Sequence, residues 1–75
     1  MEVDLDKILN AYSYEGETYG LLDTGIGSWV MVVFRDGAWA RADVDDPALI
    51  IAEGNVISIP MLKASVSPLD SINSR

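Results

Sequence analysis

The most informative hydrophobic pattern in the chain surrounds Asp36-Gly37. Residues 29–34 are all hydrophobic, and residues 38–42 alternate alanine with tryptophan and arginine. Asp-Gly is a preferred pair for a two-residue turn because both positions tolerate a positive φ. The pattern therefore predicts a β-hairpin in which Phe34 faces Trp39 across the two strands.

The amino-terminal segment has a different hydrophobic spacing. Leu5, Ile8, Leu9 and Tyr12 recur at i, i+3, i+4 and i+7, which is the spacing of one face of an α-helix. Asp4 precedes this run and is a favourable residue for capping a helix. We therefore expect a short N-terminal amphipathic helix that docks on the sheet.

Three more strands are expected from the remaining hydrophobic runs. The first lies at 18–23 and is followed by a glycine-containing loop at 24–28. The other two lie at 48–52 and 56–59, and a tight turn at Gly54-Asn55 joins them.

Residues 48–52 also fit a short helix. Asp46 would cap this helix, Pro47 would occupy its first position and Gly54 would close it. The β-branched pair Ile50-Ile51 and the brevity of the segment favour the strand.

These elements predict a mainly β (α+β) fold. It is either a small twisted antiparallel sheet or an SH3-like barrel, with about five strands and one N-terminal helix. Residues 36–39, Gly54 and Ile59-Pro60 resemble the later strands of an SH3 domain, and this resemblance implies a small barrel shape. The Ala-Leu-Tyr-Asp-Tyr opening of that family is missing, so no function is carried over from it.

The chain of 75 residues is long enough for one domain. We expect that domain at 1–64, with a helical turn at 61–64 after Pro60, and a flexible, serine-rich C-terminal tail at 65–75. A chain of this length buries only about 60% of its surface on folding. A partner protein or a second copy of the chain is therefore an expected source of further burial.

Composition excludes several kinds of chemistry. The chain has no cysteine and no histidine, which rules out disulfides, thiol and imidazole catalysis and the usual zinc sites. Twelve acidic and five basic side chains give a net charge of −7, which disfavours direct binding to nucleic acids and anionic membranes. We expect no cofactor and no metal site. No signal peptide or membrane span is visible in the sequence, so cytoplasmic localisation is expected.

One short motif, Leu21-Leu22-Asp23-Thr24-Gly25, resembles the active-site signature of retroviral-type aspartic proteases. The resemblance implies a dimer in which Asp23 of each copy supplies one of two paired carboxylates that activate water. Ile26 stands where that family usually has alanine or serine, and no flap segment can be assigned. A strand-end aspartate that leads into a glycine turn accounts for the same residues, and we expect no enzymatic activity.

The expected interaction site combines an anchor patch with an acidic steering rim. The patch is aromatic with one arginine, the rim consists of aspartates, and together they comprise Phe34, Trp39, Arg41, Asp43, Asp45 and Asp46. Trp39 has an alternative role in core packing against Phe34. The aspartates have two alternatives, a solvated acidic turn or a weak Ca²⁺ or Mg²⁺ site.

By elimination, the sequence predicts a protein that works by contact. We expect a non-enzymatic acidic protein-binding module, either an accessory subunit or an inhibitor that covers a functional surface of a larger partner with a basic surface. A sharper alternative is a virus- or mobile-element-encoded inhibitor whose carboxylates imitate phosphates on a nucleic-acid-binding enzyme. A homo-oligomer is a third possibility.

Overall fold

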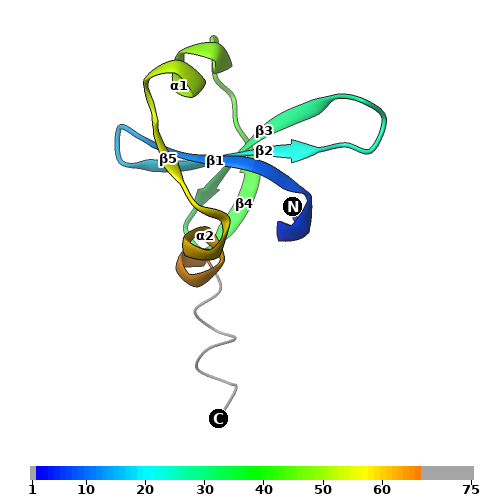
Figure 1. The fold of residues 1–75 in the computed structure, drawn as a ribbon. Helices are drawn as coiled ribbons and strands as arrows, with labels where there is room; N and C mark the ends of the chain where they lie inside the picture. The colour runs from blue at the N-terminus through cyan, green and yellow to red at the C-terminus, as the bar shows by residue number, and fades with distance from the viewer. Residues whose placement is uncertain (1, 67–75) are drawn as a thin grey trace.

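The computed structural model describes residues 2–66, which form one antiparallel sheet with a helix on each face (Figure 1). The strand order is β4-β3-β2-β1-β5, so β4 and β5 are the two edges of an open sheet. The predicted mainly β class and five antiparallel strands are confirmed, whereas the SH3-like barrel is not. The strands are β1 (Ile8–Tyr14), β2 (Glu17–Asp23), β3 (Trp29–Arg35), β4 (Ala38–Arg41) and β5 (Asn55–Ile57).

The predicted hairpin around Asp36-Gly37 is confirmed as β3 and β4. Asp36 has φ 55° and Gly37 has φ 78°, which is the pair of left-handed conformations that a type I′ turn requires. Phe34 pairs with Trp39 as predicted, and their ring centroids lie 5.2 Å apart. A second turn of this kind, at Glu15-Gly16, joins β1 to β2.

The predicted N-terminal helix is wrong. Only a single 3₁₀ turn, η1 (Leu5–Lys7), lies at this end, and strand β1 follows it directly. Asp4 does cap the turn, because its carboxylate accepts a hydrogen bond from the Asp6 backbone N–H at 3.0 Å. The capping signal was therefore correct, and the length of the helix was not.

The helical spacing in β1 arises because both faces of this strand are buried. Tyr12 packs on one face of the sheet, and Ile8 and Ala11 pack on the other. A register shift between Ile8 and Asn10 adds one residue to the strand, which changes the spacing of the inward positions from two to three. Burial on two faces together with this bulge reproduces the spacing of an amphipathic helix.

The strand predicted at 48–52 is wrong, and the helical alternative is correct, except that Asp46 forms no side-chain capping hydrogen bond. Helix α1 (Pro47–Glu53) begins with Pro47 at its first position, and the Gly54 backbone N–H closes it by donating to the Ile50 carbonyl at 2.8 Å. The predicted tight turn at Gly54-Asn55 is therefore also wrong. The next strand, β5, pairs with β1 instead of with residues 48–52.

Gly54 is expected to tolerate no side chain. A Cβ at this position would lie 2.6 Å from the Ile50 carbonyl oxygen and 3.2 Å from the Tyr12 Cβ. The φ of Gly54 is −70°, so the obstacle is close packing and not backbone strain. We expect Gly54→Ala to lower the free energy of unfolding by about 1–3 kcal/mol in urea denaturation. Gly20→Ala serves as the control, because its Cβ would meet side-chain methyl groups of Ile8 and Val32 at 3.1 Å or more and no backbone atom, and equal losses would contradict this packing.

Helix α2 (Ile59–Val66) is longer than the predicted single turn at 61–64. Pro60 lies in its first turn, where a missing N–H costs nothing. The Ser58 hydroxyl accepts a hydrogen bond from the Met61 backbone N–H at 3.3 Å. The helix includes residues 65 and 66 of the predicted tail, and the remainder of that tail, 67–75, lies outside the described residues.

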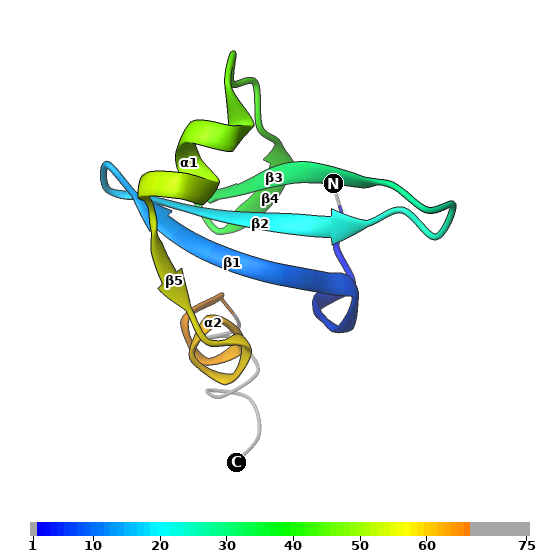
Figure 2. The same ribbon diagram turned by 45° about the horizontal axis from the view of Figure 1, so that its top comes forward.

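The sheet has a hydrophobic core on each face, because α1 covers one face and α2 covers the other (Figure 2). Leu62 of α2 is completely buried, and Ile50 of α1 is 3% exposed. The α1-side core is Tyr12, Tyr19, Leu21, Met31, Val33 and Ile50. The α2-side core is Ile8, Ala11, Val32, Trp39 and Leu62.

Two ion pairs lie on the surface of the described part of the chain. Lys63 of α2 contacts Asp6 at 2.8 Å, and Arg35 of β3 contacts Glu17 of β2 at 2.6 Å. The Arg35 guanidinium donates to both carboxylate oxygens of Glu17. These hydrogen bonds, with the positive charge of Arg35, hold the pKa of Glu17 below its ordinary value of 4.5.

The Glu17 pair predicts a pH-dependent contribution to stability. A carboxylate with a lowered folded-state pKa stabilises the fold above its unfolded-state pKa, and this contribution disappears as the pH falls through the folded-state value. We expect the stability difference between the parent chain and Glu17→Gln to be constant above about pH 5 and to shrink at lower pH. Urea denaturation across this range measures it. The shrinkage should be lost in an Arg35→Gln background, and a difference independent of pH would contradict the pairing.

No helix within residues 2–66 is long and apolar enough to cross a membrane.

Candidate functional site

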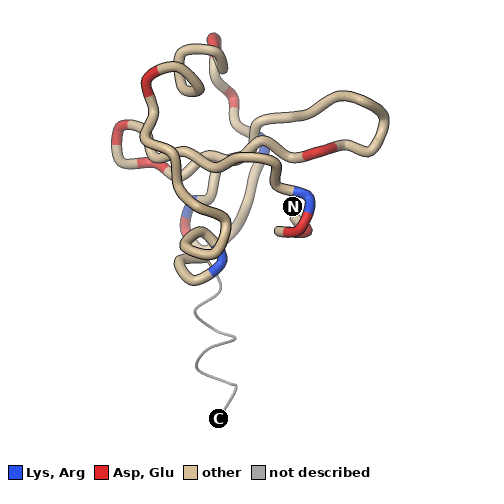
Figure 3. The backbone as a smooth tube through the Cα atoms, in the orientation of Figure 1, with Lys and Arg blue, Asp and Glu red and all other residues tan. Residues whose placement is uncertain are grey.

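A hollow of about 420 Å³ lies between the β1–β2 turn and helix α1. Acidic residues of both segments lie at this end of the molecule (Figure 3). We call it the acidic hollow. Its lining is Tyr14, Glu15, Tyr19, Val44, Asp45, Asp46, Leu49 and Ile50.

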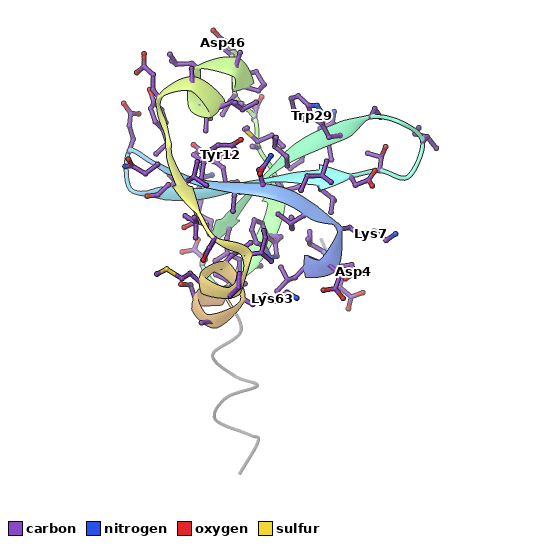
Figure 4. All side chains as sticks on the ribbon, viewed as in Figure 1. Asp4, Lys7, Tyr12, Trp29, Asp46 and Lys63 are labelled. Atoms are coloured by element: carbon purple, nitrogen blue, oxygen red, sulfur yellow. The ribbon has the colours of Figure 1, made fainter. Side chains whose placement is uncertain are left out.

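Two tyrosines of neighbouring strands form its aromatic part. Tyr14 is the last residue of β1, and Tyr19 lies in β2 directly opposite Tyr12. Because side chains alternate along a strand, Tyr12 and Tyr14 point to the same side of the sheet as α1. Figure 4 shows Tyr12 on this side, between the sheet and the helix. Tyr19 is only 7% exposed, whereas Tyr14 is half-buried.

The rim of the hollow carries acidic residues from two segments that are distant in the sequence. Glu15 occupies the first position of the β1–β2 turn, with φ 51°. Asp45 and Asp46 lie just before α1, and Asp46 marks this end of the molecule in Figure 4. None of the three takes part in either ion pair within residues 2–66. Their negative charge is therefore not neutralised by the described part of the chain.

The ionisation of Tyr14 reports this environment. Partial burial raises the pKa of the Tyr14 phenol, and the negative charges of Glu15 and Glu53 raise it further, with a contribution from Tyr19. Within residues 2–66, the charged groups that act on Tyr14 are carboxylates, whereas Tyr19 also interacts with Arg35, which is paired with Glu17. The Tyr14 side of the hollow is therefore negative and has a partly apolar lining, which favours a cationic ligand.

The structure does not bring the six predicted interaction residues together. Asp45 and Asp46 line the acidic hollow, and Asp43 is exposed but outside its lining. Trp39 is 7% exposed and belongs to the α2-side core, on the opposite face of the sheet. This placement matches the core-packing alternative for Trp39.

The other two anchor residues also lie away from the hollow. Phe34 is half-buried against the α2-side core, where it packs on Trp39. Arg41 is exposed at the end of the edge strand β4, where it pairs with Val32.

The interaction site expected from the sequence did not include Tyr14, Tyr19 or Glu15. The available signal was the alternation of Tyr12 and Tyr14 immediately before Glu15-Gly16, which is itself a two-residue turn. A hairpin at this position would have aligned Tyr14 and Tyr19 on one face.

Asp23 of the protease-like motif takes part in local turn hydrogen bonds. Its carboxylate accepts a hydrogen bond from the Gly25 backbone N–H at 2.9 Å. The Thr24 hydroxyl donates to the Ser28 carbonyl at 3.1 Å within the same loop. This is the geometry of a strand-end aspartate that leads into a glycine turn.

Within residues 2–66, no three acidic side chains gather closely enough to hold a metal ion. The run Asp43, Asp45 and Asp46 thus forms an exposed acidic segment between β4 and α1.

Fold and site together define a small, mainly β domain with an acidic, tyrosine-lined surface hollow. Comparisons with models of protein families, with curated proteins and with solved structures found no match. What the chain does must therefore be inferred from its own residues.

Proposed function

We propose that this chain is a non-enzymatic protein-binding module that attaches to a basic protein surface through the acidic hollow. The observation that carries this proposal is the set of three rim carboxylates, Glu15, Asp45 and Asp46, which have no ion-pair partner within residues 2–66. A net charge of −7 on 75 residues adds long-range attraction to any basic partner.

Affinity capture with two matched variants tests this proposal. The hollow variant, Glu15→Gln/Asp45→Asn/Asp46→Asn, removes the rim charges. The control variant, Glu2→Gln/Asp23→Asn/Asp36→Asn, removes the same number of charges elsewhere, so both variants have a net charge of −4. Asparagine at position 23 keeps an oxygen that can accept from Gly25, and asparagine tolerates the positive φ at position 36.

The parent chain and the control variant are expected to retain the same basic proteins, and the hollow variant is expected to lose them. The retained proteins should also be released by raised salt, because screening weakens attraction between exposed charges. Equal retention by all three baits would contradict a role for the hollow.

An inhibitor that imitates phosphates is the second candidate. The rim carboxylates, which have no ion-pair partner in the described part of the chain, favour it, because they present negative charges at a surface as a nucleic-acid backbone does. In this case the captured partner should bind nucleic acid, and the chain should compete with that nucleic acid for the partner. A ternary complex of chain, partner and nucleic acid would instead support an accessory subunit.

A further inference from the structure

The lining of the acidic hollow combines three kinds of chemical group at one place. Carboxylates stand at the rim, two tyrosine rings form the walls, and aliphatic side chains of Val44, Leu49 and Ile50 complete the lining. Its volume of about 420 Å³ falls within the ~300–1,000 Å³ of small-ligand pockets. A ligand that fits this lining must carry a cationic group and must also pack favourably against aromatic and aliphatic side chains.

Tyr19 adds a hydroxyl that has no side-chain hydrogen bond within residues 2–66. Its side chain is more than nine-tenths buried and lines the hollow. No side-chain oxygen or nitrogen that is sealed from solvent in these residues lacks a hydrogen-bond partner, so the Tyr19 hydroxyl is reached by solvent. It is therefore free to exchange a hydrogen bond with water for one with a ligand.

We propose that the acidic hollow receives the guanidinium group of an arginine side chain of the basic partner. This inference rests on the proposed function, because it names the residue through which the partner binds. An ammonium group is compact and strongly hydrated, so it loses more hydration on entering a partly apolar site. A guanidinium is planar and more weakly hydrated, stacks on aromatic rings and offers five N–H donors.

Each part of the lining has a role toward such a group. Tyr14 offers a ring face for stacking, and the Tyr19 hydroxyl accepts an N–H. Glu15, Asp45 and Asp46 accept charge-assisted hydrogen bonds. Leu49 and Ile50 contact the methylene groups of the incoming side chain. The carboxylates on both sides of the hollow disfavour an anionic ligand in the same place.

Nuclear magnetic resonance titration of the full chain tests the assignment with three small probes. N-acetyl-arginine amide carries the guanidinium, N-acetyl-lysine amide carries an ammonium, and N-acetyl-citrulline amide has the arginine shape without the charge. We expect saturable shifts of backbone amides around the β1–β2 turn and α1. Arginine should bind about two- to fivefold more tightly than lysine, and citrulline should produce no saturable shift.

Three single variants locate the contact. Tyr19→Phe removes only the hydroxyl, and Tyr14→Leu replaces the phenol ring with an aliphatic group, so each should weaken arginine binding about two- to tenfold. Tyr12→Phe removes the hydroxyl of a buried tyrosine outside the lining and should leave the affinity unchanged. The same spectra show whether each variant is folded.

The outcomes separate this inference from the proposed function. The arginine assignment is wrong if the arginine and lysine probes bind with equal affinity, or if Tyr14→Leu and Tyr19→Phe leave the affinity unchanged. Neither result would contradict binding of a basic partner. Saturable shifts confined to another surface, or none at all, also overturn the arginine assignment. The proposed function itself fails if the hollow variant captures the same proteins as the parent chain.

Discussion

Replacing Trp39 by alanine is expected to lower the free energy of unfolding by about 3–5 kcal/mol. The Trp39 side chain is 7% exposed and packs against Phe34 in the α2-side core. A domain of 75 residues has a total stability of roughly 4–11 kcal/mol, so this substitution should remove a large share of it. Circular dichroism and urea denaturation measure the loss.

Trp29 supplies the matched control for this substitution. It is the other tryptophan of the chain, is 45% exposed, and lies at the start of β3 on the α1 side of the sheet (Figure 4). Trp29→Ala should cost clearly less than Trp39→Ala, because less of its surface is removed from water. Equal costs, or a stable Trp39→Ala chain that has lost only partner binding, would show that Trp39 is a surface anchor.

Leu62→Ala is expected to have the next largest effect, a loss of about 2–5 kcal/mol. Leu62 is fully buried and is the buried residue of α2. Without it, the helix keeps only partly buried contacts with the sheet. Because α2 is eight residues long, it is too short to persist without docking.

The control for this prediction lies one position earlier in the same helix. Met61 is 65% exposed, so Met61→Ala should change stability by no more than about 0.5 kcal/mol. Urea denaturation of both variants tests whether α2 docks through Leu62. Similar effects of the two substitutions would mean that the helix docks through another face or not at all.

The parts of the fold that could be predicted from the sequence are those fixed by local chemistry. Asp36-Gly37 defines both the turn and the register of β3 with β4, because two adjacent residues with positive φ permit few other connections. Pro47 and Gly54 likewise mark the first position and the end of α1. The prediction for residues 48–52 gave more weight to the β-branched pair Ile50-Ile51 than to these two end residues. In the structure, burial of Ile50 against the sheet offsets its weak helix propensity.

The parts that could not be predicted depend on contacts between distant segments. The spacing of Ile8 and Tyr12 is helical only because α1 and α2 bury opposite faces of β1, and neither helix is encoded near that strand. The acidic hollow has the same origin, since Glu15 and Asp46 are 31 positions apart in the sequence. The aspartates at 45 and 46 were predicted as site residues from their charge, whereas their tyrosine neighbours come from the tertiary fold.

The most direct test of contact through the acidic hollow is the rate of association with a captured partner at two salt concentrations. For the parent chain and the control variant of net charge −4, we predict fast association that slows as salt rises. The hollow variant of the same net charge should associate more slowly and depend less on salt. Identical rates for the hollow and control variants would contradict the account, because total charge rather than the hollow would then govern binding.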